Sequence, residues 1–214
     1  MPTTSSPCRA VILATGIVLA TLGQSTPVSA GQYWVAPDGD DRLDGTSRRT
    51  AWASPSRGQP TRTHEPVTRG GMRLPVYSTE GFLDSGRLRV GKLIVNYVAR
   101  TEREFVLAGP WPEDTAAFAR VYDADLLGGR SFAPGDVILL AGGEWVDRPL
   151  HFCQPGTPDH PITYRPAPGH RPRLVSTRYN RSPVRHLGSR RSPLTTNVVL
   201  SGLDIRNAAD GNHG

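Results

Sequence analysis

The sequence predicts an all-β protein: a solenoid in which short strands stack into parallel sheets, carrying a small antiparallel β insert. Two observations predict it. The 214 residues include 23 Gly and 20 Pro, which leave few stretches long enough for helices. The apolar runs are very short, and Gly, Pro or Asn corners separate them. Such strands are too short for a β-sandwich, but stacked coils would bury a continuous interior with them.

Residues 1–30 have the organisation of a secretory signal. Arg9 supplies the positive region, residues 10–22 are apolar, and small residues precede an expected cut after Ala30. The apolar run is shorter than the roughly 18 to 20 residues needed to span a bilayer, so we expect no membrane anchor once the signal is removed. The mature chain would begin at Gly31, and the protein would be secreted or held at the cell surface.

Residues 31–54 are predicted to form an N-terminal strand followed by turns rich in Asp and Gly. Residues 55–111 are predicted to form a linker and a small β insert, because the first part is rich in Pro, Gly, Ser and Arg and short β-type runs follow it. Gly91 and Lys92 separate two of these runs. A two-residue hairpin turn of type II′ fits this spacing, since glycine readily takes the positive φ that the turn requires.

The remaining residues, 112–214, are predicted to hold a short helix and then the first coils. Pro, Glu and Asp at 112–114 indicate a helix start, because acidic residues stabilise the positive end of a helix. Phe118, Val121 and Tyr122 would share one face of this helix, and the glycines at 128–129 would end it. Short strands are predicted at 137–140, 161–164, 173–175, 197–200 and 203–205.

Four segments carry a family resemblance: 33–52 (YWVAPDGDD, DGTS and AW), 132–143 (FAPGDVILLAGG), 156–164 and 199–207 (VLSGLDIRN). They resemble the N-terminal part of secreted proteins with a right-handed parallel β-helix, of the pectin-lyase-like superfamily. The resemblance covers residues 32–54 and about 114–209, and it implies a right-handed parallel β-helix with a short N-terminal capping helix. Within the insert, residues 78–82 (STEGF), 85–86 (SG) and 94–97 (IVNY) resemble a small β unit of phage structural proteins.

Enzymes of this superfamily act on acidic polysaccharides, commonly by β-elimination: a cation neutralises the uronate carboxylate, and a basic side chain removes the C5 proton. The resemblance therefore implies a polysaccharide lyase-like protein. The alternative is a non-catalytic adhesive or phage-tail-like module, which the insert favours. No catalytic residue is assigned, because Lys92 lies outside the matching segments. Only about three coil-like segments precede Gly214, so we expect further, catalytic coils or a partner to cover the open end.

The formal net charge of +6 indicates an anionic partner, and every cationic side chain except Lys92 is an arginine. The arginines are scattered through connections rich in Pro and Gly instead of following one helix, so we do not expect nucleic-acid binding. Arg165, Arg173 and Arg178 are candidates for binding a polyanionic carbohydrate. Solvated surface arginines are the alternative.

Four carboxylates fall within seven residues, at Asp38, Asp40, Asp41 and Asp44. Calcium is the candidate cofactor, because Ca²⁺ prefers such dense oxygen ligands. Their spacing differs from that of the EF-hand loop, and turns built on Asp and Gly also explain these residues.

Three other kinds of site were considered. Asp204 and Asp210 form a candidate carboxylate pair for glycoside hydrolysis, with outward-facing coil residues as the alternative. The six histidines lack the spacing of a zinc site. After signal removal Cys153 would be the only cysteine, and beside Phe152 it is expected to be a small interior residue rather than a nucleophile.

Overall fold

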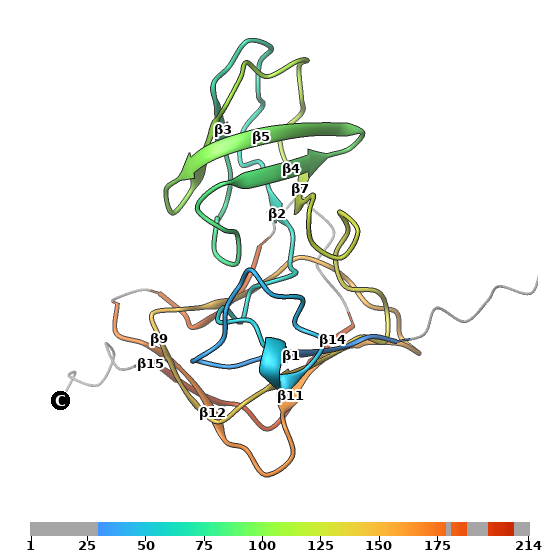
Figure 1. Cartoon of the computed structure of the whole chain (residues 1–214), viewed down its shortest axis with the longest axis vertical. Helices are drawn as coiled ribbons and strands as arrows, with labels where there is room; N and C mark the ends of the chain where they lie inside the picture. The colour runs from blue at the N-terminus through green and yellow to red at the C-terminus, as the bar shows by residue number, and fades with distance from the viewer. Residues whose placement is uncertain (1–29, 179–180, 188–196, 208–214) are drawn as a thin grey trace, which may run out of the picture.

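The structure is a computed structural model, and it describes residues 30–178, 181–187 and 197–207. This part of the chain is all-β, as the sequence predicts. Figure 1 shows two bodies: a triangular body below, and an antiparallel sheet above it. The only helical element of the described residues is a 3₁₀ turn, η1 (Arg48–Thr50).

Parallel sheets build the triangular body. The first sheet holds β1 (Gln32–Val35), β8 (Val137–Leu140), β11 (Ile162–Pro166) and β14 (Val198–Leu200). The second holds β9 (Gly143–Val146), β12 (Pro172–Ser176) and β15 (Asp204–Asn207), and the third holds β10 (Leu150–Phe152) and β13 (Val184–His186). The chain adds one strand to each sheet in succession. Each strand from β11 to β15 therefore pairs in parallel with the strand that precedes it in the same sheet.

The antiparallel body is one six-stranded sheet. Its strands, in spatial order, are β2 (Thr61–Arg62), β7 (Arg120–Asp123), β4 (Gly86–Val90), β5 (Leu93–Arg100), β6 (Glu104–Leu107) and β3 (Arg73–Pro75). The sheet extends past the predicted boundary at residue 111, because β7 pairs with both β2 and β4. The predicted hairpin is confirmed: Val90 pairs with Leu93, and the φ of Gly91 is 59°, the positive value that a type II′ turn needs.

The turn that precedes β8 also forms as predicted. The N–H of Asp136 donates to the carbonyl of Ala133 at 3.1 Å, and Gly135 has a φ of 92°. Pro134 presets the φ of the first central position, so the four residues meet the requirements of a type II turn. The turn leads into β8, whose Ile138 side chain is fully buried.

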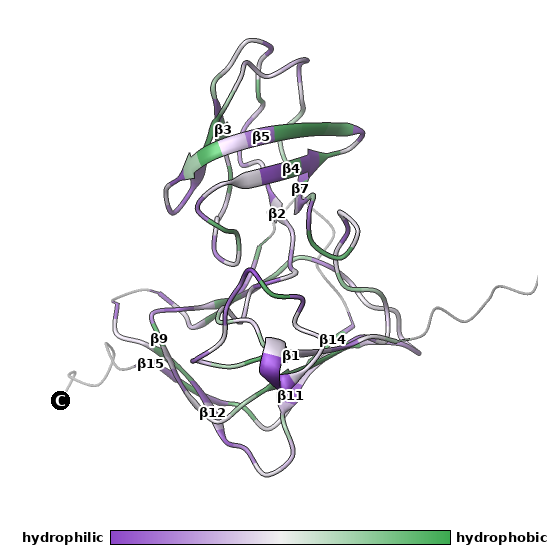
Figure 2. Ribbon diagram, viewed as in Figure 1, coloured by the Kyte–Doolittle hydropathy of each residue, from purple (hydrophilic) through white to green (hydrophobic). Residues whose placement is uncertain are grey.

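Each body has its own apolar core. Trp52, Trp145 and Tyr164 are completely or almost completely buried in the triangular body, and Phe105 and Trp111 are buried in the antiparallel body. Burial of such large rings supplies most of the stabilisation, at about 25 cal/mol per Å² of apolar surface. Some apolar side chains of β5 are exposed instead of buried in a core. Figure 2 shows an apolar segment at the start of this strand, and Ile94 is 56% exposed.

The segment expected to be a linker is buried and joins the two bodies. The guanidinium of Arg57 donates to the carboxylate of Asp123 at 2.6 Å and to the carbonyl of Gly81 at 2.9 Å, both in the antiparallel body. The hydroxyl of Ser56 donates to the carbonyl of Pro149 at 2.7 Å, in the triangular body. The Ser56 residue is fully buried and Arg57 is 4% exposed. The insert is therefore packed against the triangular body and does not hang on an exposed loop.

The helix predicted after residue 112 is wrong, and so is the capping helix that the resemblance implied. Residues 112–119 form irregular backbone and turns, and Arg120–Asp123 is strand β7. Phe118 has a φ of 66°, in the left-handed region that a right-handed helix excludes. Val121 pairs with Val90 and is fully buried in the sheet. Long-range strand pairing therefore outweighs the local helical pattern.

Candidate functional site: an arginine-lined cleft

A cleft of about 170 Å³ lies between the two bodies, next to a recess of about 40 Å³. The antiparallel body contributes residues 77–80 and the β5–β6 turn, and the triangular body contributes β10 and the segments around β13. We call it the arginine cleft, and its charged side chains are Arg100, Arg103, Arg178, Arg181, Arg185, Glu80, Glu102 and Asp147. The five arginines outnumber the three carboxylates, so the cleft attracts anions.

His151 lines both the cleft and the recess. It lies on β10 directly beside Arg185 of β13, and it is 5% exposed. Within the described part of the chain, neither ring nitrogen has a hydrogen-bond partner. An unpaired buried polar group costs roughly 1 to 3 kcal/mol, so a hydrogen-bonding partner at this side chain would be favourable.

The charge state of His151 follows from its surroundings. Burial, and then the positive charges of Arg185 and Arg181, lower the pKa of His151 to about 4. The imidazole is therefore neutral at pH 7, with one nitrogen that donates a hydrogen bond and one that accepts. The recess beside it is large enough for a water molecule or a hydroxyl group, since a single water needs roughly 10 to 15 Å³ of such space.

Glu102 connects the two bodies across the cleft. Its carboxylate accepts hydrogen bonds from Arg178 at 2.7 Å and from Arg181 at 2.9 Å. These bonds lower the pKa of the Glu102 carboxyl below its usual value, and the bond from Arg178 has the largest effect. All three side chains are about half exposed, so the pairs contribute little to stability. They do place one internal carboxylate where an anionic ligand would bind.

The pKa values of the other two carboxyl groups of the cleft are shifted in opposite directions. Burial raises the pKa of Glu80, although the hydroxyl of Ser54 donates to its carboxylate at 3.1 Å. Hydrogen bonds from Thr177 lower the pKa of Asp147, with the hydroxyl at 2.6 Å and the N–H at 2.8 Å. Asp147 also has a φ of 53°, a strained value for a residue other than glycine. The cleft thus combines a carboxyl whose pKa is raised with one whose pKa is lowered.

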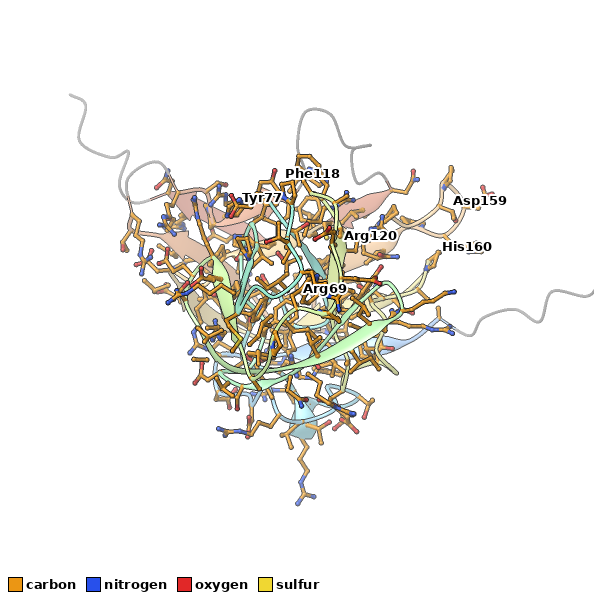
Figure 3. The ribbon with its side chains drawn as sticks, turned by 90° about the horizontal axis from the view of Figure 1, so that it is seen from above. Arg69, Tyr77, Phe118, Arg120, Asp159 and His160 are labelled. Carbon is orange, nitrogen blue, oxygen red and sulfur yellow. The ribbon has the colours of Figure 1, made fainter. Side chains whose placement is uncertain are left out.

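A partly exposed aromatic pair borders the cleft. Tyr77, which lines it, stacks on Phe118 with ring centroids 6.2 Å apart and an interplanar angle of 21°. Figure 3 shows the two side chains close together. The ring of His64 meets Tyr77 edge-on at 6.1 Å. Flat aromatic faces beside charged groups favour ligands that have both an apolar face and polar edges.

The four predicted calcium ligands all accept hydrogen bonds from other groups of the protein. The carboxylate of Asp38 accepts from the guanidinium of Arg48 at 2.9 Å, and those of Asp40, Asp41 and Asp44 accept from nearby backbone N–H groups. Within the described ranges, no group of three or more His, Cys, Asp or Glu side chains is arranged to hold a metal ion. Asp40 and Asp44 hold local turns, whereas Asp38 forms an ion pair and Asp41 binds backbone further along the chain. Calcium binding stays a prediction.

Only one of the three predicted polyanion-binding arginines lies in the cleft, Arg178. Arg173 is engaged by Glu144 and by Asp204, the latter at 2.9 Å, and Arg165 is exposed on β11. Asp204 also accepts from Arg206 at 2.9 Å, so it behaves as a surface ion-pair partner. Asp210, its predicted catalytic partner, lies outside the described residues.

Cys153 is an interior residue, as predicted. It is fully buried, its thiol donates to the carbonyl of Pro60 at 3.0 Å, and burial raises its pKa to about 11. A protonated, enclosed thiol is a poor nucleophile. The predicted signal lies outside the described residues except for Ala30, which is exposed.

Comparisons with protein-family models, with curated proteins and with solved structures found no match. Within the part of the chain that the structure describes, no helix is long and apolar enough to cross a membrane. The geometry of the cleft is therefore the main evidence for function.

Sequence reasoning missed most of the cleft. It did not single out His151, Glu80 or Glu102, because they come from separate segments whose proximity only the packing of the two bodies creates. One local signal was present: Arg178, Arg181 and Arg185 fall within eight residues. Such a density of arginine in a short segment indicates an anion-binding surface.

Proposed function

We propose that the protein binds an acidic polysaccharide in the arginine cleft. The observation that carries this proposal is the combination of five arginines with a buried, unpartnered His151 in one cleft. Guanidinium groups form paired hydrogen bonds with carboxylates, and a neutral imidazole both donates to and accepts from hydroxyl groups. A uronate polymer offers carboxylates and hydroxyls on adjacent ring atoms, and the Tyr77 ring would pack against a sugar face.

The proposed scaffold is the start of a right-handed parallel β-helix. Three parallel sheets, visited in turn by the chain, support this interpretation. Stacked coils expose an edge where the last turn has no neighbour, and β14 and β15 are edge strands of their sheets. Val199 and Ile205 on these strands are 41% and 44% exposed. We propose that a further coil or a partner covers this edge.

Binding has more support than β-elimination. A lyase needs a base that removes the C5 proton, and an effective base has a pKa near the working pH. The pKa of about 4 leaves His151 unprotonated but weakly basic. This observation argues against His151 as the base of a lyase, and so it favours the non-catalytic, adhesive alternative over a lyase that depends on His151. In either case we propose export by the signal that ends at Ala30 and a role outside the cell.

The experiment is calorimetric binding of polygalacturonate to the exported protein. Arg185→Gln should weaken binding about tenfold, the loss expected for one charge-assisted contact of roughly 1.4 kcal/mol. Arg165→Gln is the matched control, since it removes the same charge from an exposed position on β11, outside the cleft.

Equal weakening by the two variants would show that binding follows net charge alone and would contradict the proposed site. The same samples should be assayed for unsaturated uronate product. Turnover that Arg185→Gln abolishes would favour the lyase over the adhesive module.

A further inference from the structure

Asp136, in the turn before β8, has a buried carboxylate that binds the backbone nitrogen of Gly31. It is 2% exposed, and its two oxygens accept from the N–H of Gly31 at 2.6 Å and from the N–H of Ala133 at 2.7 Å. Among the described residues, no cationic side chain forms an ion pair with it. Burial takes the ionised form of Asp136 out of water with no positive charge beside it, and this raises the pKa of Asp136.

Gly31 is held firmly beside this carboxylate. Its carbonyl accepts from the N–H of Val137 at 2.9 Å, at the start of the β1–β8 pairing. A Cβ atom at position 31 would lie 2.7 Å from the hydroxyl of Tyr33, so the Tyr33 ring packs directly over the glycine. Because contacts on both sides fix the residue, its nitrogen stays next to Asp136.

We propose that signal removal completes a buried ion pair between the new α-ammonium group of Gly31 and the carboxylate of Asp136. This proposal rests on the predicted cut after Ala30 and not on polysaccharide binding. Hydrolysis adds one water across the Ala30–Gly31 peptide bond, leaving a carboxylate on Ala30 and an amine on Gly31 that is protonated at neutral pH. The nitrogen that now donates one neutral hydrogen bond would become a cation with three donors.

The pair ties maturation to folding. Gly31 and Asp136 join β1 to β8, which are 105 residues apart in the chain and form the first contact of the parallel sheets. The uncut precursor lacks the cation, so its β1–β8 contact holds a buried and uncompensated carboxylate. The exported form is therefore more stable than the precursor sequence in the same solution.

The test compares two forms of the exported protein. One begins at Gly31, as verified by N-terminal sequencing, and the other keeps Ala30 ahead of it, which restores the amide. At pH 7 the form that begins at Gly31 should melt about 4 °C higher, the shift expected when a titrating group changes its pKa by roughly one unit on folding. The difference should disappear above about pH 10, where the amine loses its proton. It should also disappear when both forms carry Asp136→Asn.

Three outcomes would overturn the proposal. One is an equal melting temperature for the two forms, and another is a difference that persists with Asp136→Asn. The third is a natural cut at a different residue. If Asp136→Asn prevents folding, NMR titration of the Gly31 α-amino group replaces it. A pKa clearly above the ordinary value of roughly 7.7 to 8.0 supports the pair, and an ordinary pKa rejects it.

Discussion

Replacing His151 by leucine should remove much of the protein's sensitivity to mild acid. In the folded protein burial, together with Arg185 and Arg181, lowers the pKa of His151 from 6.5 to about 4. Between these values the unfolded chain binds a proton at this residue and the folded chain does not. The stability associated with the neutral imidazole is therefore complete above pH 6.5 and is lost as the pH falls towards 4.

The size of the effect follows from the shift. Each pKa unit corresponds to 1.36 kcal/mol, so a shift from 6.5 to about 4 predicts a loss of about 3 kcal/mol in the free energy of unfolding. Burial raises the pKa of Glu80 and Asp136, and these groups contribute with the opposite sign. They are present in both proteins, so they cancel when the leucine variant is compared with the wild type.

The assay is urea unfolding of both proteins at pH 7.5, 6, 5 and 4. The wild type should lose about 3 kcal/mol more than His151→Leu across this range. His160→Leu, at an exposed position that Figure 3 shows away from Tyr77, should follow the wild type. Parallel loss of stability in the wild type and His151→Leu would refute the reasoning, because it would mean that His151 is not held neutral by its surroundings.

Three further predictions concern ion pairs and metal. Arg57→Leu should cost about 3 to 5 kcal/mol in urea unfolding, because it leaves the mostly buried carboxylate of Asp123 without its cation. Arg87→Leu, which breaks an exposed pair, should change the stability little. Glu102→Gln should tighten polygalacturonate binding several-fold in calorimetry, because it releases Arg178 and Arg181 from the Glu102 carboxylate. An unchanged affinity would show that Glu102 does not compete with the ligand for these arginines. Calcium should raise the melting temperature if the Asp-rich turns bind it, a shift that Asp41→Asn should reduce.

Local chemistry determined the parts of the fold that were predicted correctly. A Pro-Gly pair before an apolar run is enough to place the turn and strand at Ala133–Leu140, and Gly91 is enough to place the hairpin. These features depend on the φ preferences of one or two residues. The helix expected after residue 112 does not form, because burial and strand pairing in the sheet stabilise Val121 more than a position on one face of a helix would.

The amino-acid sequence by itself determined the all-β class, the short strands and the excess of arginine. Only the tertiary structure decided where that charge is concentrated. Arg100 and Arg185 are distant in the chain, and they share a cleft because buried residues such as Arg57 pack one body on the other. The missing partners of His151 are likewise a property of packing, since burial and hydrogen bonding depend on neighbours from other segments.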